Sequence, residues 1–368
     1  MRSLSLLAMA LLFLLSPAAT VRGGEQNLGV WMRLDLIGGL DPDYIAGTLR
    51  DSGVNSVFLL TPFPPREEEY DRIDRLDSSL GDDIDLHLWL TVFRNERYLA
   101  ENPNLSFVST EELSDPWINP LGQNFRADLI QGVEEMVDRL RPEGIFLDYF
   151  YVPLGPFDNK TLDSFSQHLG TNLTVSEITG SPDILGMFFE WRNDVIYETL
   201  RTIRRQFPGV QLSVFIIMLE EAQRLARGQD VARFAGIVDF IVPNTYHVVA
   251  MRPASWVGDG VKALRASGAR DIWSGIQGYD IQEIELRKAL RSALKANAEG
   301  AIIFRYGTMT EDHWKQVRRA YSGTDPIIIL APLAATALVL SSIFWIRRKG
   351  PGTKASGKTG RKRPGRKR

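Results

Sequence analysis

Apolar and polar residues follow two alternating patterns along the chain. Short runs of apolar residues are typical of buried parallel strands, and longer segments with an apolar residue every three or four positions are typical of amphipathic helices. Eight strands are predicted, over residues 28–36, 54–61, 84–93, 144–152, 210–218, 237–246, 271–279 and 301–306. Helices are predicted over residues 43–52, 125–140, 188–207, 220–234, 255–266, 281–298 and 311–321.

Eight strands that alternate with helices predict an α/β fold in which the strands close into a (β/α)8 TIM barrel. The alternative is an open doubly wound sheet, which normally has a glycine-rich turn after its first strand to bind a nucleotide. Residues 36–40 do not have that pattern. Two connections, 94–123 and 154–185, are longer than the others. We expect them to be irregular and to shape a pocket over the barrel mouth.

Both ends of the chain resemble targeting segments. Residues 1–24 contain Arg2, an apolar run and then small residues, which is typical of a secretory signal peptide; an uncleaved anchor is the alternative. Residues 327–346 have no charged side chain and precede a basic segment. This predicts one transmembrane helix with a cytoplasmic tail over 347–368, the alternative being a ninth core helix. The barrel is predicted to occupy residues 25–324, on the extracellular side.

Charge is distributed unevenly along the chain. The formal net charge is −2, but all 45 acidic residues and only 30 of the 43 basic residues lie within 25–326, whose formal charge is −15. An acidic body argues against nucleic acid as a partner. The basic tail and the apolar helix favour membrane lipid as a partner. The chain has no cysteine, which excludes disulfides, thiolate metal sites and a cysteine nucleophile.

Asp148 is the first candidate for chemistry, because it ends an apolar run that two tyrosines and a proline follow. Burying an unpaired carboxylate is costly, so an acid at the end of a buried strand needs partners or a ligand. The alternative is a structural Asp that caps the next turn or pairs with an Arg. In a TIM barrel the site lies at the C-terminal ends of the strands. That position adds Trp31, Arg33, Asp35, Trp89, Tyr149, Tyr151, Glu220, Asn244, Tyr246, Gln277, Tyr279, Asp280 and Arg305.

Aromatic rings beside carboxylates and amides suit a carbohydrate, because sugar C–H faces pack on rings and amides bind hydroxyl groups. Two carboxylates can protonate the leaving oxygen and attack or stabilise the anomeric carbon. The four histidines are scattered without ligand spacing, and no G-x-S-x-G motif occurs. We therefore expect a carbohydrate site with no metal, no cofactor and no serine triad.

Several motifs along the predicted barrel share a family pattern. They are Trp117-Ile118-Asn119-Pro120, Gly144-Ile145-Phe146-Leu147-Asp148-Tyr149 before Pro153, Glu190-Trp191-Arg192, residues 238–246, and Gly275-Ile276-Gln277-Gly278-Tyr279. Together they resemble the glycoside-hydrolase-like TIM-barrel families, which are related to α-glycosidase barrels. The resemblance implies a glycan-directed site and places Asp148 on the fourth strand, where related α-glycosidases have their nucleophile. Phe146 stands where these families tend to have His.

The leading hypothesis is a membrane-anchored extracellular glycoside hydrolase. Asp148 would be the nucleophile or transition-state stabiliser, and a second acid would donate the proton. Asp280 ranks first as donor because it leaves the seventh strand toward the mouth, and Glu220, Glu221 and Asp35 are alternatives. The expected substrate-binding residues are Trp31, Arg33, Asp35, Trp89, Tyr149, Asn244, Tyr246, Gln277 and Arg305. The other hypothesis is a barrel that binds glycan or cell-wall polymer without cleaving it; a rim acid about 5 to 10 Å from the Asp148 carboxyl would favour the enzyme.

Overall fold

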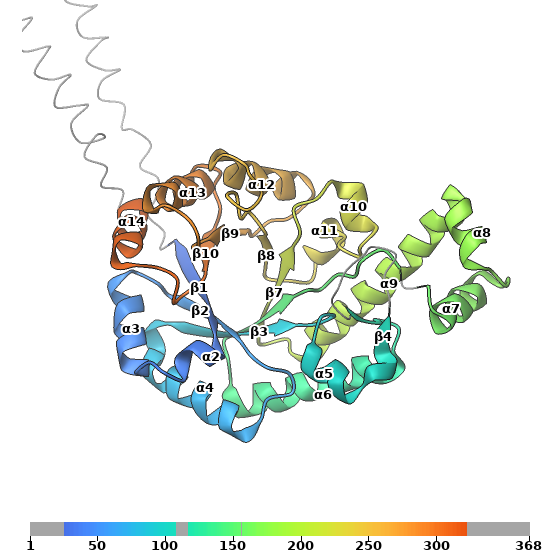
Figure 1. Ribbon diagram of the computed structural model, residues 1–368, viewed down its shortest axis with the longest axis horizontal. Coiled ribbons are helices and arrows are strands. Elements are labelled where there is room, and N and C mark those ends of the chain that lie inside the picture. The colour runs from blue at the N-terminus through green and yellow to red at the C-terminus, as the bar shows by residue number, and fades with distance from the viewer. Residues whose placement is uncertain (1–25, 108–116, 156, 322–368) are drawn as a thin grey trace, which may run out of the picture. The chain divides into compact units, whose positions relative to one another are not determined.

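Eight parallel strands form a single sheet in the computed structural model, which describes residues 26–107, 117–155 and 157–321. The strand order is β8-β7-β6-β3-β2-β1-β10-β9, and bridges from Ile241 to Ile272 and from Asn244 to Gly275 bring β8 beside β9. The sheet is therefore nearly closed, and the predicted barrel is confirmed (Figure 1). Its strands are β1 Asn27–Arg33, β2 Ser56–Leu60, β3 Asp85–Thr91, β6 Gly144–Asp148, β7 Gln211–Ile216, β8 Phe240–Pro243, β9 Trp273–Gln277 and β10 Gly300–Phe304.

Helices surround the barrel (Figure 1). The longer ones are α3 Pro42–Asp51, α4 Glu67–Leu80, α6 Gln123–Leu140, α9 Pro182–Gln206, α12 Ser255–Ala266, α13 Glu283–Lys295 and α14 Glu311–Tyr321. Shorter ones are α2 Leu34–Ile37, α5 Glu96–Glu101, α10 Glu221–Leu225 and α11 Val231–Phe234. Local sequence sets where they begin. For example, the Asp41 carboxylate accepts a hydrogen bond from the amide of Asp43, and Pro42 occupies the first position of α3, where no N–H is needed.

Several helices around the barrel differ from the sequence prediction. Residues 220–234 form two short helices, α10 and α11, instead of one. Gly228 lies between them with φ 89°, and a β carbon there would lie 2.2 Å from Cδ1 of Ile196, so the chain turns where only glycine fits. In addition, the sequence analysis did not predict α4, which follows β2, or the short helices α2 and α5.

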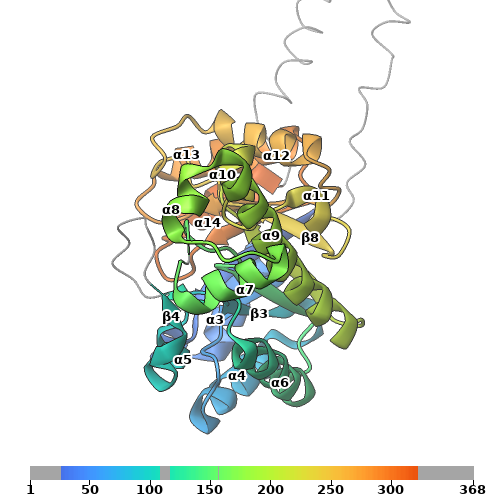
Figure 2. The ribbon, with the colours of Figure 1, turned by 90° about the vertical axis from the view of Figure 1, so that its right-hand side faces the viewer.

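The connection after β6 is helical, which corrects the prediction of an irregular segment over 154–185. It contains α7 (Asn159–Leu169) and α8 (Val175–Gly180), which pack with the first turns of α9 around Phe165, Ile178 and Phe188. We call α7, α8 and these first turns the helical insertion. It projects from one side of the barrel in Figure 1 and faces the viewer in Figure 2. The prediction of an irregular segment over 94–123 is also corrected in part. The connection after β3 contains α5, and in it β4 (Ser106–Phe107) pairs with β5 (Trp117–Ile118).

Aromatic side chains fill the inside of the barrel, whereas aliphatic side chains dominate the layer between strands and helices. Glycines on the strands make room for the rings. A β carbon on Gly144 would lie 2.1 Å from Nδ1 of His87, and one on Gly29 would lie 2.6 Å from the Phe58 ring. Burial lowers the pKa of His87 to about 4, so its imidazole is neutral inside the barrel. The aromatic cluster comprises Trp31, Phe58, Trp89, Phe146, Phe215, Phe240 and Trp273.

The predicted signal peptide (1–24), transmembrane helix (327–346) and tail (347–368) lie outside the described residues. Among the helices that the structure does describe, none combines the length and the apolar composition needed to cross a membrane.

Candidate functional site

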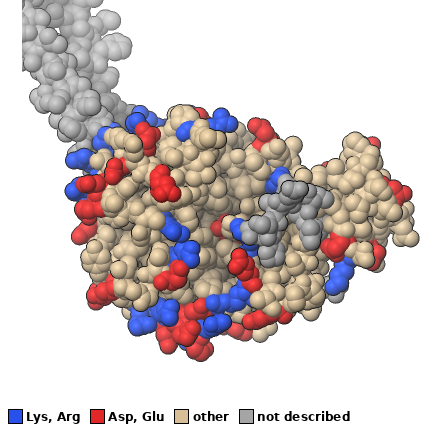
Figure 3. All heavy atoms as spheres, in the orientation of Figure 1, with Lys and Arg blue, Asp and Glu red and all other residues tan. Residues whose placement is uncertain are grey.

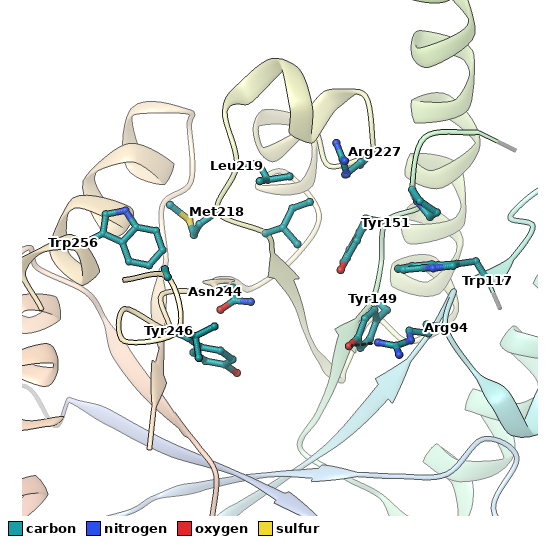
Figure 4. Close-up of a pocket in the computed structure, with 14 residues that line it drawn as sticks. Arg94, Trp117, Tyr149, Tyr151, Met218, Leu219, Arg227, Asn244, Tyr246 and Trp256 are labelled. Carbon is teal, nitrogen blue, oxygen red and sulfur yellow. Dashed lines mark hydrogen bonds between the residues drawn. The ribbon is translucent and has the colours of Figure 1, made fainter. Parts of the chain in front are cut away.

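A pocket of about 710 Å³ lies where three neighbouring strands, β6, β7 and β8, end (Figure 4). This is the end of the barrel at which a TIM-barrel site is expected. In the space-filling view the surface is hollowed inside the ring of helices (Figure 3). Further lining residues come from the segment after β3, from β5 and from α12. The full set is Arg94, Trp117, Tyr149, Tyr151, Pro153, Ile217, Met218, Leu219, Arg227, Asn244, Tyr246, Val249, Ala250 and Trp256.

Asp148 is the last residue of β6 and directly precedes the lining residue Tyr149. Only 8% of its surface is exposed. Its Oδ1 accepts a hydrogen bond from the Tyr149 amide at 2.7 Å, and its Oδ2 accepts one from Nε1 of Trp89 at 3.0 Å. Tyr149 has φ 48°, in the left-handed region that aromatic residues rarely adopt. The carboxylate therefore caps a sharp turn at the edge of the pocket.

Burial raises the pKa of Asp148 to about 6, because the charged form loses its hydration. Three interactions oppose this effect by favouring the carboxylate: the hydrogen bonds from the Tyr149 amide and from Trp89, and the positive charge of Arg94. Desolvation outweighs them. Asp148 can therefore exchange a proton near neutral pH, as a general acid or base must.

One side of the pocket consists of aromatic rings, which we call the aromatic wall: Trp117, Tyr149 and Tyr151. The Trp117 ring centre lies 5.7 Å from that of Tyr149 and 5.4 Å from that of Tyr151. A guanidinium N–H of Arg94 donates to the Tyr149 hydroxyl at 2.8 Å. Burial raises the pKa of Tyr151 and of Tyr246, so both hydroxyl groups keep their protons and can donate hydrogen bonds. Rings that carry donors suit the faces and hydroxyl groups of a sugar.

The aromatic residues predicted to bind substrate divide into two groups. Tyr149 and Tyr246 line the pocket, as does the predicted amide Asn244. Trp31 does not, because it is 1% exposed inside the barrel, with its ring centre 6.4 Å from that of Tyr246. Trp89 also lies in the interior cluster, and its indole N–H holds Asp148. The two tryptophans thus lie inside the barrel, next to the pocket residues, and do not line the pocket.

Arg33 and Asp35 line a second pocket, of about 330 Å³. They form an ion pair with each other at 2.6 Å. Thr91, which pairs in register with Asp148, lines the same second pocket. The second pocket therefore borders the strand next to β6, and Arg33 and Asp35 are separate from the aromatic wall.

Gln277 has a structural task instead of the predicted contact with substrate. It is fully buried. Its Oε1 accepts a hydrogen bond from the Val249 amide at 3.1 Å, and its Nε2 donates to the Tyr279 carbonyl at 2.8 Å. Gln277 thus positions a loop that lines the pocket. Arg305 lines neither pocket, and its guanidinium carbon lies 5.7 Å from the centre of the Phe304 ring.

The two leading candidates for proton donor do not line the pocket beside Asp148. Asp280 and Glu220 are exposed, and the residues described as lining the pocket include no carboxylate. Burial, and after it the Asp280 charge, raises the pKa of Tyr279, whose ring meets that of Tyr246 edge-on at 6.2 Å. A position after a strand places a residue at the mouth, but it does not fix the direction of its side chain.

Ten of the fourteen lining residues were not candidates in the sequence analysis, among them Arg94, Met218, Arg227 and Trp256. Two of them could have been predicted from the strand pattern, because Arg94 directly follows a predicted strand and Met218 is the last residue of another. Arg227 follows α10, and Trp256 lies in the first turn of α12. Their places over the mouth depend on how those helices pack, which local sequence does not reveal.

Metal ligands are not grouped in the described part of the chain. No set of three or more His, Asp or Glu side chains there could hold a metal ion. The chemistry that the pocket offers comes from one buried carboxyl, phenol hydroxyls, an amide and guanidinium groups.

The comparisons with known proteins support the fold. No protein-family model matches the sequence, and no curated protein matches it. The spore cortex-lytic enzyme SleL of Bacillus cereus is 10% identical with a TM-score of 0.53, over 79% of this chain and 73% of that one. A group IV chitinase of Ostrinia furnacalis is 10% identical with a TM-score of 0.54, over 81% and 100%.

A third similar structure is the α-L-fucosidase isoenzyme 2 of Paenibacillus thiaminolyticus. It is 13% identical with a TM-score of 0.58, over 81% of this chain and 49% of that one. At such identities the likeness concerns the fold. At that level, the resemblance to glycoside-hydrolase-like TIM barrels is confirmed.

Proposed function

We propose that the protein is a glycoside hydrolase that acts on a carbohydrate in the pocket beside Asp148. The observation that carries this proposal is a buried carboxyl with a pKa of about 6 at the edge of a pocket walled by Trp and Tyr rings. The pocket volume, about 710 Å³, is typical of small-molecule sites. Similar folds in a chitinase and a fucosidase support the reaction class.

In this proposal Asp148 is the proton donor. Its protonated carboxyl gives a proton to the glycosidic oxygen, and the bond from that oxygen to the anomeric carbon breaks with its electron pair passing to the oxygen. Water then adds to the anomeric carbon, and the proton that it loses restores the carboxyl. The sequence analysis expected Asp148 to be the nucleophile or the transition-state stabiliser. The raised pKa favours the donor role instead, because a protonated carboxyl is a poor nucleophile.

A barrel that binds glycan without cleaving it is the second candidate. It is favoured by one observation: the described residues that line the pocket include no carboxylate that could act with Asp148 as a pair. The aromatic wall would bind a sugar in either case.

A glycan screen of the full-length protein in lipid nanodiscs, with released reducing sugar measured in parallel, separates the two candidates. Sugar release that needs the protein supports the hydrolase. Binding without release on every bound glycan supports the binding barrel and overturns the hydrolase. If no glycan is bound and no sugar is released, both candidates are overturned.

The pH dependence of hydrolysis should follow the titration of Asp148. The donor form is the protonated one, so kcat/KM, which follows the pKa of the free enzyme, should be highest below pH 6 and fall about tenfold per pH unit above it. Trp89→Phe removes a hydrogen bond that favours the charged form, so it should raise the pKa of Asp148. The fall in hydrolysis rate should then begin at a higher pH. The measurement is kcat/KM between pH 4 and 9.

The matched control is Trp256→Phe, which changes a tryptophan of the pocket that has no hydrogen bond to Asp148. In this control the hydrolysis rate should fall at the same pH as in the wild type. If the rate of Trp89→Phe falls at the same pH as that of the wild type, a group other than Asp148 controls the pH dependence.

We also propose that the barrel is extracellular and is anchored by the helix over 327–346, with the tail over 347–368 in the cytoplasm. Twenty uncharged residues followed by eleven bases support this orientation. Protease applied to intact cells should digest or release the barrel and leave an epitope fused after Arg368 uncut. Loss of that epitope in sealed cells would contradict the orientation.

A further inference from the structure

The pocket beside Asp148 has two chemically different sides. Opposite the aromatic wall lies a side that we call the apolar wall: Met218, Leu219, Val249, Ala250 and Trp256. Figure 4 shows Met218 and Trp256 across the pocket from Tyr149 and Arg94. Met218 and Leu219 follow β7, Val249 and Ala250 belong to the loop after β8, and Trp256 belongs to α12. A sugar has hydroxyl groups around its ring and cannot by itself satisfy a surface of this kind.

Two side chains of the apolar wall are exposed to solvent, although large apolar side chains are usually buried. Leu219 has 38% of its surface exposed and Val249 has 60%. Apolar surface that gathers at the edge of a pocket marks a place where a ligand is bound, because covering it removes that surface from water.

The loop that supplies Val249 and Ala250 to this wall is fixed in place. The buried Gln277 side chain binds the Val249 amide at 3.1 Å, and the Ala250 amide donates to the Tyr246 carbonyl at 3.0 Å. Fixing a loop before the ligand arrives lowers the entropy cost of binding. Polar interactions inside the barrel therefore hold apolar side chains in position at its mouth.

We propose that the substrate is a sugar with an apolar substituent, an alkyl or acyl chain. The sugar ring lies on the aromatic wall and the chain lies on the apolar wall. Both walls belong to one pocket, so a single amphiphilic molecule can cover both. This inference rests on the proposed function for the sugar, but it does not require that the sugar be cleaved.

Equilibrium binding of methyl, butyl and hexyl β-D-glucosides tests the inference. The full-length protein is held in lipid nanodiscs, binding is followed by tryptophan fluorescence, and the signal of empty nanodiscs is subtracted. Each buried methylene strengthens binding about fourfold, so the hexyl glucoside should bind about fifteenfold more tightly than the butyl glucoside. Equal dissociation constants for the three glucosides would overturn the proposal.

Serine substitutions locate the effect. The double variant Leu219→Ser with Val249→Ser should lower the ratio of hexyl to butyl affinity to about threefold, because two residues of the apolar wall become polar. Met251→Ser is the matched control, since Met251 is 92% exposed on the same loop and does not line the pocket. Its ratio should equal that of the wild type. An equal loss in Met251→Ser would mean that the exposed loop binds nanodisc lipid, and would overturn the proposal.

The outcome is independent of catalysis. A chain-length effect without sugar release in the glycan screen would support this inference and contradict the hydrolase. Sugar release with no chain-length effect would contradict this inference and leave the hydrolase intact.

Discussion

Asp148→Asn is expected to lower kcat for glycoside hydrolysis by about 10²- to 10⁴-fold, the usual contribution of a general acid. The amide has nearly the shape of the carboxyl but cannot supply the proton. Its oxygen can still accept the hydrogen bond from the Tyr149 amide, so the turn after β6 should persist. Binding of the glycan should change little, because the aromatic wall is untouched. The measurements are single-turnover hydrolysis and equilibrium binding on the same glycan.

The matched control is Asp259→Asn, which removes an exposed carboxylate on α12 that pairs with Lys262 at 3.3 Å. It should leave kcat within about twofold of the wild type, because surface ion pairs contribute little. Circular dichroism of both variants checks that each is folded. Full hydrolysis by Asp148→Asn on a glycan that the wild type cleaves would refute the role of Asp148.

Gly144→Ala is expected to destabilise the barrel by about 1 to 3 kcal/mol, the usual cost of overpacking a core. The added methyl group would lie 2.1 Å from Nδ1 of His87. His87 is fully buried, and its ring stacks on Phe58 with centres 4.5 Å apart, so it has little room to move away. The midpoint of thermal unfolding should fall by about 3 to 10 °C.

Gly47→Ala provides the contrast. Gly47 lies within α3, where an added β carbon would meet no atom within 4 Å. Alanine is the better helix former, so this variant should gain up to about 1 kcal/mol. A double variant, Gly144→Ala with His87→Ala, should lose less stability than the sum of the losses of the two single variants, because without the imidazole the clash is absent. Equal unfolding midpoints for Gly144→Ala and the wild type would show that the barrel interior is not tightly packed around His87.

The sequence predicted the barrel because its strands are buried on both faces. Apolar runs such as 144–147 and 301–304 have no other stable environment in an α/β protein, so all eight strands are present within a few residues of the predicted limits. The helices of the insertion were missed although local signals for them exist. Asp158 caps α7, and Thr174 with Glu177 forms a capping box at the start of α8. Glycines and prolines in the segment 154–185 instead led to the prediction that it is irregular.

The candidate site was predicted in position but not in its contacts. Asp148 lies where the strand pattern placed it, because the strand ends there. Its hydrogen bond from Trp89 joins side chains of two neighbouring strands, and which rings lie inside the barrel depends on register. The apolar wall depends on the loop after β8, which a side chain of β9 holds. Such contacts join residues far apart in sequence, so local patterns do not contain them.

The helix α9 joins the helical insertion to the barrel as one continuous rod of 25 residues, about 37 Å long. Phe188, near its beginning, belongs to the small core of the insertion, whereas Ile203, near its end, packs against the barrel. Between them the buried Arg192 guanidinium donates to the carbonyls of Pro153 and Gly155, on the segment that leaves Asp148. The helical insertion is therefore connected to the segment after β6 through Arg192 as well as through the chain itself. Substitutions that disturb the packing of α7 or α8 are therefore expected to shift the segment that follows Asp148 at the end of β6.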